Sequence, residues 1–394
     1  MSANGRRVSG NSSGDLVRGA AEGRIGRRDF IQKGSVSLAG AGLATLLSGP
    51  SGSGQPMQKS KVVLVKHDGA TDENGVGSAD IVGRMVHRSV RELTGKDSLR
   101  EAWREFVSPD DVVGLKVNVR GGRNLSTQPC VVDAIVEGLV KAGVRPNNII
   151  IWDAWNRELV RAGYILNDSD EGLRCYGTDR GTYKPDRDPR RRTSGEAWKP
   201  FYSAKPVMVE DKAVYFSKIL VDEITALINV PLIKDHRIAG VTVSMKNHFG
   251  SILNPNDLHG NRCDPYLGAL NATGPIKGKT RLIIVDGLRA LYNGGPRDNP
   301  QWKWRQNSII ASTDTVAIDQ LGLEIIEEKR KQNELSPLGD LARHVATAAR
   351  LGLGTNDPAR MDIKEIDITG SASPMRGVGR TLDRRTVGRI LFVS

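Results

Sequence analysis

The sequence predicts an α/β fold: a mostly parallel sheet flanked by helices, in a single large domain with a polar mid-chain insertion. Continuous apolar runs, of the kind that form strands buried on both faces, recur along the chain. Amphipathic stretches with helical periodicity separate the first three runs, an order that favours parallel strands joined by right-handed crossovers. A chain of 394 residues is long enough to bury a sizeable core.

The first half of the predicted domain, which spans residues 57–394, alternates strands with helices. The first helix starts at Ser78 and ends at Gly95, residue types that commonly cap helices. The second helix opens with Pro129, in a first-turn position, and closes at Gly143. The predicted elements of this half are a strand at 61–66, a helix at 78–95, a strand at 111–119, a helix at 129–143 and a strand at 148–152.

The periodic patterns dissolve between residues 158 and 212. The piece at 176–200 is rich in Arg, Asp, Gly and Pro, a composition that predicts a surface excursion. Regular order then resumes, with predicted strands at 213–220, 224–233, 281–288 and 308–313, helices at 314–332 and 337–352, and strands at 363–370 and 389–394.

The stretch at 240–253 fits two structures. In a helix Val241, Met245 and Phe249 share one face. In a strand Val241, Val243 and Met245 alternate instead. We favour the helix.

The N-terminus resembles a twin-arginine export signal. Arg27 and Arg28 are followed by Phe30 and then by a mildly apolar run at 35–47. That run has 13 residues, and roughly 20 apolar residues are needed to span a bilayer. We therefore expect residues 1–56 to be an export signal with a Gly/Ser-rich linker, and the protein to be periplasmic or otherwise extracytoplasmic after passage through the twin-arginine translocation machinery. No clear A-x-A cleavage site follows, so membrane attachment through an uncleaved signal stays open.

The distribution of charge and the spacing of the cysteines argue against nucleic-acid binding and against cysteine-bound metal centres. The net charge is +12, but the basic residues are scattered rather than gathered into a stripe, so we expect no nucleic-acid partner. The three cysteines, Cys130, Cys175 and Cys263, lie 45 and 88 residues apart. Because no C-x-x-C spacing is present, the sequence predicts neither an iron–sulfur cluster nor a zinc ribbon.

Ionisable and amide side chains gather where the predicted strands end. Ligands of open α/β sheets bind outside the carboxyl ends of the strands, so these side chains are expected at one rim. They are Lys116, Asn118, Thr127, Asp153, Lys234, His236 and Asp286; Lys246, Asn247, His248 and His259 follow His236 within the next 23 residues. A lysine desolvated beside an apolar strand end has a lowered pKa, and an imidazole titrates near neutrality. The set suits acid–base chemistry, Schiff-base formation or the binding of carboxylate and phosphate groups. Structural roles stay open as well: Thr127 also suits an ordinary helix start, and Asp286 an ordinary turn.

Six ordered segments carry a family resemblance. They are LKVNV at 115–119, TQP at 127–129, the stretch at 230–252, DG at 286–287, GGP at 294–296 and DTVAID at 314–319. The central pattern is matched by Lys234, His236, Gly240, Thr242, Lys246, Asn247 and Gly250. Together the segments resemble the bacterial and archaeal family called domain of unknown function 362, over roughly residues 60–350. As its name implies, that family has no settled activity.

The resemblance has two further implications. Some members carry a ferredoxin-like segment, which this chain lacks because its cysteines do not cluster. The lysine and the Asn247–His248 pair after a strand end are also similar to lactate-racemase-type proteins, which hold a nickel-pincer nucleotide.

Two functions stay open from the sequence, and both involve a small-molecule ligand. In the first, the protein is an exported enzyme that acts on a small anionic substrate, with His236, Lys246 and Lys234 as its catalytic acid–base groups. The residues that bind the anion would be Lys116, Asn118, Thr127 and Asn247. Those that orient the catalytic groups or hold a divalent metal would be Asp153, Asp286, His248 and His259.

In the second, the protein is a non-catalytic metal- or cofactor-binding accessory protein of an exported redox system. Its metal ligands would be His236, His248 and His259. The sequence leaves the cofactor's identity open in either case.

Overall fold

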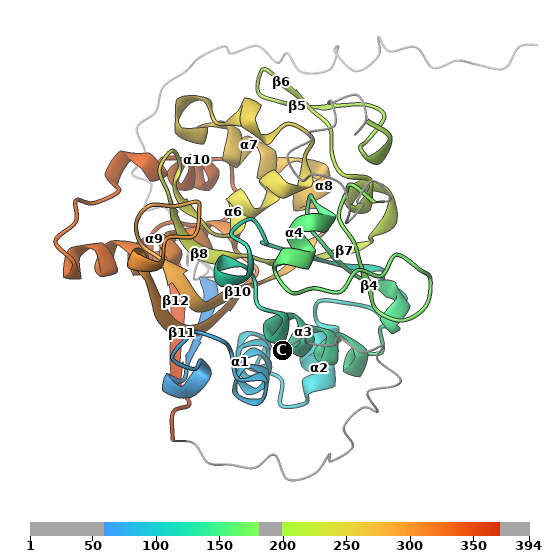
Figure 1. Ribbon diagram of the computed structural model, residues 1–394, viewed down its shortest axis with the longest axis horizontal. Coiled ribbons are helices and arrows are strands. Elements are labelled where there is room, and N and C mark those ends of the chain that lie inside the picture. The colour runs from blue at the N-terminus through green and yellow to red at the C-terminus, as the bar shows by residue number, and fades with distance from the viewer. Residues whose placement is uncertain (1–58, 181–198, 371–394) are drawn as a thin grey trace, which may run out of the picture. The chain divides into compact units, whose positions relative to one another are not determined.

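One large sheet organises the part of the chain that the computed structural model describes, residues 59–180 and 199–370 (Figure 1). The predicted export signal with Arg27, Arg28 and Phe30, and the predicted strand at 389–394, lie outside these residues. The strands of the sheet are β1 (Ser60–Lys66), β2 (Val113–Val117), β3 (Ile149–Trp152), β4 (Arg174–Cys175), β7 (Ala226–Val230), β8 (Leu232–His236), β9 (Gly240–Thr242), β10 (Thr280–Leu291), β11 (Lys303–Ser312) and β12 (Met361–Asp367). Their order is β12-β1-β11-β10-β7-β2-β3-β4, and β8 pairs with both β10 and β9.

The predicted fold class is confirmed, because the sheet is mostly parallel. β2 runs parallel to both β3 and β7, and β7 runs parallel to β10. β11 is antiparallel to its neighbours β10 and β1 because it returns directly from the end of β10. The first two predicted strands do not pair with each other: β11, β10 and β7 lie between β1 and β2.

Helices cover both faces of the sheet, which explains why the strands are apolar on both faces. Figure 1 shows α1 (Ala79–Thr94), α2 (Leu99–Arg104) and α3 (Pro129–Ala142) together on one side. Val63, Leu115 and Ile151 pack into the core under these helices. The opposite face packs against α7 (Tyr266–Ala272), α8 (Gly274–Lys277) and α9 (Thr315–Gln332). The remaining regular elements are α4 (Asn156–Arg161), α6 (Ser244–Asn247), α10 (His344–Arg350), and the small hairpin of β5 (Val207–Val209) and β6 (Lys212–Val214).

The apolar run predicted as one strand at 224–233 is two strands in the structure. It breaks at Pro231, which has no N–H to donate to a neighbouring strand. The backbone carbonyl of Pro231 still accepts a hydrogen bond of 2.9 Å from the N–H of Asp286. β8 then runs on beside the second half of β10 and carries its polar residues past the end of β7.

The helix predicted at 240–253 is wrong for its first residues. Residues 240–242 form β9, whose register against β8 pairs Lys234 with Thr242. The short helix α6 follows, and a 3-10 turn runs from His248 to Ser251. Local periodicity suggested one helix, but pairing with β8 dictates the strand.

Three other segments differ from their predictions. The strand predicted at 213–220 is only β6, followed by a π-helical turn at Ile219–Glu223, and the helix predicted at 337–352 is a 3-10 turn at Gly339–Ala342 followed by α10. The segment at 158–212 was expected to lie on the surface, but its described residues are partly buried. It adds β4 to the edge of the sheet and buries Tyr164, Tyr176 and Tyr202.

Within residues 59–180 and 199–370, no helix is long and apolar enough to cross a membrane.

Candidate functional site

A cavity of about 980 Å³ opens at the carboxyl ends of the parallel strands. Its walls come from segments that follow β2, β3, β8 and β10, which is where open α/β sheets place ligands. The polar residues that line it are Asn118, Arg120, Asp153, Glu158, Arg161, Tyr202, Lys234, His236, Arg237, Thr242, Lys246, Asn247, Asn256, His259 and Arg297. The structure therefore brings together most of the predicted site.

The β8–β9 hairpin supplies part of the cavity floor. Lys234 and Thr242 occupy paired positions on its two strands and are both buried. The Nζ of Lys234 donates to Oδ1 of Asn118 at 2.9 Å. Burial lowers the pKa of Lys234 to about 8. The buried hydroxyl of Thr242 has no hydrogen-bond partner among the described residues.

α6 presents Lys246 to the same floor. The Nζ of Lys246 lies 3.2 Å from Nε2 of His259 and 3.7 Å from the centroid of the Phe249 ring. It also lies 3.9 Å from Sγ of Cys263. Burial lowers the pKa of Lys246 to about 8, so the neutral amine and the ammonium ion are both accessible near neutral pH.

The hydrogen bonds of the two cavity histidines assign their tautomers. Nδ1 of His236 accepts from the backbone N–H groups of Ile238 and Ala239, both at 3.2 Å, so the neutral ring carries its proton on Nε2. His259 is the reverse: its Nδ1 donates to the carbonyl oxygen of Pro255 at 3.0 Å, which leaves the Nε2 lone pair facing Lys246.

Both histidines are held neutral. Burial, and then the charge of Lys246, lower the pKa of His236 to about 2 and that of His259 to about 4. The two rings stack with centroids 5.7 Å apart.

A buried polar layer lies directly behind the floor. Lys116 is fully buried and its Nζ donates to Oδ1 of Asp153 at 2.8 Å. Burial lowers the pKa of Lys116, and Asp153 opposes that shift. Asn247 donates to the carbonyl oxygen of Lys116 at 2.9 Å and to Oδ1 of Asn229 at 2.7 Å, and accepts from Nδ2 of Asn118 at 3.0 Å. These bonds fix the amides that face the cavity.

Asp153 orients Lys116 and the backbone beside it. Besides the ion pair with Lys116, its carboxylate accepts from the backbone N–H groups of Val119 and Ala154, at 3.0 and 2.8 Å. Gly250 passes so close that an added Cβ would lie 2.2 Å from Oδ1 of Asp153 and 2.7 Å from Nζ of Lys116. Only glycine fits there without displacing the ion pair.

Besides Lys116, which lies in the layer behind the floor, three predicted site residues do not line the cavity. Thr127 accepts from the N–H of Asn118 at 2.9 Å and donates to the carbonyl oxygen of Val230 at 2.8 Å. The carboxylate of Asp286 accepts from two backbone N–H groups at the start of α3 and within β10, at 2.7 and 3.0 Å. His248 is buried with its Nδ1 3.3 Å from Oγ of Ser251. All three are bonded to protein groups that shape the surroundings of the site.

The described residues do not form the metal site that the sequence left open. Nowhere in residues 59–180 and 199–370 do three or more His, Cys, Asp or Glu side chains come together in a group able to hold a metal ion. Of the predicted ligands, His248 and Asp286 lie outside the cavity. The three cysteines are buried and free.

Four arginines at the cavity mouth escaped the sequence prediction. They are Arg120, Arg161, Arg237 and Arg297, all exposed. In the part of the chain that the structure describes, none of their side chains forms a hydrogen bond or an ion pair. With Lys234 and Lys246 they place six cationic side chains around the cavity, against the two carboxylates of Asp153 and Glu158. Arg237 directly follows β8 and Arg120 comes shortly after the end of β2, so their places at strand ends could have found them, but nothing local marks the other two.

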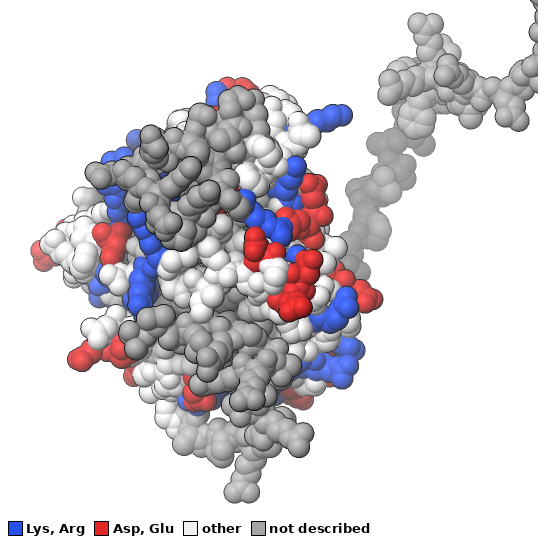
Figure 2. All heavy atoms as spheres, turned by 45° about the vertical axis from the view of Figure 1, so that its right-hand side comes forward, with Lys and Arg blue, Asp and Glu red and all other residues white. Residues whose placement is uncertain are grey.

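The outer surface contrasts with this one-sided charge. On the face shown in Figure 2, patches of acidic and basic side chains lie next to each other. The charge on this face is therefore mixed, whereas the cavity lining is mainly positive.

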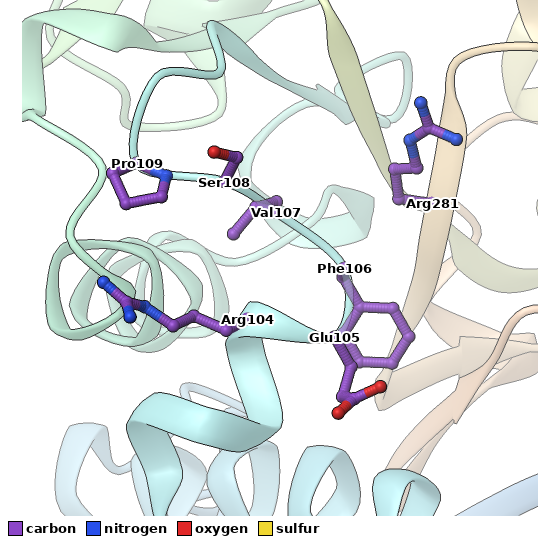
Figure 3. A pocket seen from close by; sticks show the side chains of 7 residues that line it. All are labelled: Arg104, Glu105, Phe106, Val107, Ser108, Pro109 and Arg281. Atoms are coloured by element: carbon purple, nitrogen blue, oxygen red, sulfur yellow. The ribbon is translucent and has the colours of Figure 1, made fainter.

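A second hollow, of about 530 Å³, lies near the first residues of β10 (Figure 3). Arg104, Glu105, Phe106, Val107, Ser108, Pro109 and Arg281 line it. Arg281 belongs to the first residues of β10, far along the strand from the carboxyl-end rim. Arg104 is bound to the carbonyl oxygen of Ala142 at 2.9 Å, and Glu105 pairs with Lys96 at 3.3 Å. This hollow gathers no convergent chemistry, so we place the functional site at the large cavity.

Comparison with known proteins gives a family. Among curated proteins, none matches the sequence. A crystal structure of a protein from Thermotoga maritima is similar at 9% identity and a TM-score of 0.31, over 66% of this chain and 60% of that one, so the chain spans less than two thirds of that protein's length. The family model described as domain of unknown function (DUF362) matches residues 113–324, just over half of the chain and every residue that lines the cavity. The chain therefore belongs to the family of domain of unknown function (DUF362).

Proposed function

We propose that the protein is an enzyme that acts on a small anionic substrate by proton transfer, with Lys246 as the acid–base group. The observation that carries this proposal is the pairing of Lys246 with His259 at the floor of a cavity whose four arginines have no partner within residues 59–180 and 199–370. Such perturbed titratable groups in a cavity are typical of catalytic sites.

Lys246 has the properties of a general base. With a pKa of about 8, about a tenth of its side chains are neutral near pH 7. The neutral amine takes a proton from the substrate, and the resulting ammonium returns one. The Nε2 lone pair of His259 accepts a hydrogen bond from Nζ in either state and so holds the amine in place.

His236 serves as a neutral hydrogen-bond donor instead of a base. Its Nδ1 is occupied by two backbone N–H groups, so only Nε2–H is free to meet a ligand. A fixed N–H aimed at a carbonyl or carboxylate oxygen stabilises the negative charge that develops there when a neighbouring proton is removed. Lys234 holds the anionic group of the substrate.

Deuterium exchange tests the proposal without knowledge of the product. The full chain is incubated in D2O with a panel of small carboxylates and phosphorylated compounds, and loss of C–H signals is followed by NMR. We expect exchange in at least one compound, reduced about a hundredfold or more in Lys246→Met, since general acid–base groups contribute that much. Lys277→Met, which alters an exposed lysine of α8 outside the cavity, is the matched control. Exchange that persists at the wild-type rate in Lys246→Met would contradict the role of this residue.

Export by the twin-arginine route is a second part of the proposal and rests on Arg27, Arg28 and Phe30 of the sequence. Replacing both arginines by lysine should leave the protein in the cytoplasmic fraction, because the pair is the signal's defining feature. Unchanged recovery outside the cytoplasm would exclude this route.

A further inference from the structure

We infer that the ligand of this cavity carries two separated anionic groups, one held at the floor by Lys234 and Thr242 and the other at the mouth by the arginines. This inference rests on the proposed function, because it concerns the same cavity. It specifies the substrate class as a bis-anion: two phosphate or carboxylate groups joined by a neutral spacer.

The floor offers hydrogen-bond donors that no group of the described residues accepts. Of the three N–H groups of Lys234, one is taken by Asn118. The buried hydroxyl of Thr242, on the strand paired with Lys234, has no partner in the described part of the chain. The Nε2–H of His236 has none there either, since both recorded bonds of this ring are at Nδ1. Buried polar groups are rarely left unpaired, so the floor is built for a ligand.

The acceptors next to this floor are already occupied. Oδ1 of Asn118 accepts from Lys234, and Oδ1 of Asn247 accepts from Asn118. Asp153 is bound to Lys116 and to two backbone N–H groups. Among the described residues, the groups left without an acceptor are N–H groups of Lys234, the hydroxyl of Thr242 and the Nε2–H of His236, and that combination of donors favours an anion.

The charge of the two buried lysines at the floor also favours an anionic ligand. Lys234 and Lys246 are both buried, and neither forms an ion pair with a carboxylate among the described residues. The repulsion between them contributes to the lowered pKa of Lys234. A buried charge without a counter-ion is costly, and a bound carboxylate or phosphate would compensate it.

The mouth forms a second and distinct subsite. Arg120 follows β2, Arg161 ends α4, Arg237 follows β8 and Arg297 follows β10, so four segments each bring one arginine to the same opening. All four are exposed, whereas Lys234 and Thr242 are buried. Guanidinium groups bind phosphate and carboxylate through paired N–H donors, and no described residue occupies the donors of these four arginines.

The size of the cavity separates the two subsites. Its volume of about 980 Å³ lies in the range of roughly 300–1,000 Å³ that holds a whole small molecule. A lone phosphate or carboxylate at the floor would leave most of this space empty and the arginines unused. A ligand that binds both the floor subsite and the mouth subsite must extend from the floor of the cavity to its mouth.

Binding measured by calorimetry on the full chain tests this inference. The phosphate probes are fructose 6-phosphate and fructose 1,6-bisphosphate, and the carboxylate probes are butyrate and glutarate. We expect the bis-anion of at least one pair to bind about tenfold or more tightly than its mono-anion, as one added charge-assisted contact implies. The pair that shows this difference identifies the anion.

One variant at the mouth and one at the floor measure the contribution of each subsite to binding. Arg237→Gln/Arg297→Gln should remove the advantage of the bis-anion and leave binding of the mono-anion within about twofold. Thr242→Val, which keeps the side-chain shape, should weaken both members of a pair to the same extent. Arg281→Gln, at the second hollow, is the matched control and should change neither. Thermal unfolding of each variant confirms that it folds.

Each outcome bears on the inference. Equal affinities within both pairs, or a mouth variant that weakens mono- and bis-anions alike, overturns it. Failure of the proposed function looks different: Lys246→Met would then keep full deuterium exchange while the preference for the bis-anion persists. Loss of exchange in Lys246→Met without any bis-anion preference would leave the proposed function in place and remove the two-group substrate.

Discussion

The carboxylate of Asp319 in α9 accepts a hydrogen bond of 2.6 Å from the backbone N–H of Ser244, the first residue of α6. The N–H of Met245 lies 3.3 Å from the same carboxylate. A helix of four residues leaves its first N–H groups without intrahelical partners, and Asp319 satisfies them from a distant part of the chain. The position of Lys246, two residues on, therefore depends on α9.

Removing this carboxylate should loosen α6. We expect Asp319→Ala to lower the free energy of unfolding by about 1–3 kcal/mol, since buried N–H donors lose their acceptor. Asp319→Asn keeps one oxygen acceptor and should cost less. Denaturant unfolding measures both, and the deuterium-exchange rate should fall more in the alanine variant than in the asparagine variant. Equal stabilities of the alanine variant and the wild type would contradict this role.

Gly250 should not tolerate a side chain. An alanine Cβ would lie 2.2 Å from Asp153 and 2.7 Å from Lys116, and such overpacking typically costs about 1–3 kcal/mol. Gly83 in α1 is a matched control, because nothing outside its own helix lies within 4 Å of an added Cβ. Gly83→Ala should stabilise the protein by up to about 1 kcal/mol. Thermal unfolding distinguishes the two, and similar effects at both positions would be inconsistent with the contact at Gly250.

The buried lysines should make stability rise with pH in the alkaline range. Lys246 has a pKa of about 8 in the folded protein and about 10.4 when unfolded. Between these values the unfolded chain binds more protons, so raising the pH favours the folded state by up to about 1.4 kcal/mol per pH unit. Below the folded pKa the penalty for burying the charge is present in full.

Lys246→Met should therefore show a shallower rise in unfolding free energy over this window than the wild type. Lys277→Met should follow the wild-type curve. Parallel curves for Lys246→Met and the wild type would show that this lysine titrates normally in the folded protein.

His236 should stay neutral on acidification. Burial lowers its pKa to about 2 in the folded protein, whereas an unfolded histidine titrates at about 6.5. Nitrogen-15 NMR should show an Nε2–H tautomer in the folded chain from about pH 8 down to about pH 4. Because the unfolded chain takes up this proton first, the residue should reduce stability as the pH falls below about 6.5. A normal titration curve in the folded state, or an Nδ1–H tautomer, would contradict the assignment.

Strands buried on both faces were the most predictable part of the fold. β1 and β3 have continuous apolar centres, and in β2 only Lys116 interrupts the apolar run, so burial alone identifies these strands. The break at Pro231 and the strand at 240–242 were not predictable in the same way. Both depend on which neighbour offers backbone partners, and residue spacing carries no information about that.

The site was predictable where strand ends supply its residues. Lys234, His236 and Asp153 reach the cavity because parallel strands share a carboxyl-end rim. Asp286 also comes from one of the parallel strands, but its carboxylate accepts hydrogen bonds from backbone N–H groups and does not line the cavity. Thr242 lies on the second strand of a hairpin and Arg297 in the loop between β10 and β11. Only the three-dimensional structure shows that both residues line the cavity.

The alternation of β8 also constrains how this protein can change over evolution. Lys234 and His236 line the cavity, whereas Asp235, between them, does not line it and binds the N–H of Gly295 at 2.9 Å. Inserting or deleting one residue here would exchange these faces, aiming a carboxylate into the cavity and withdrawing both the lysine and the histidine. Segment 232–236 should therefore keep its length among descendants of this chain, even where their loops at the cavity mouth grow or shrink to admit other ligands.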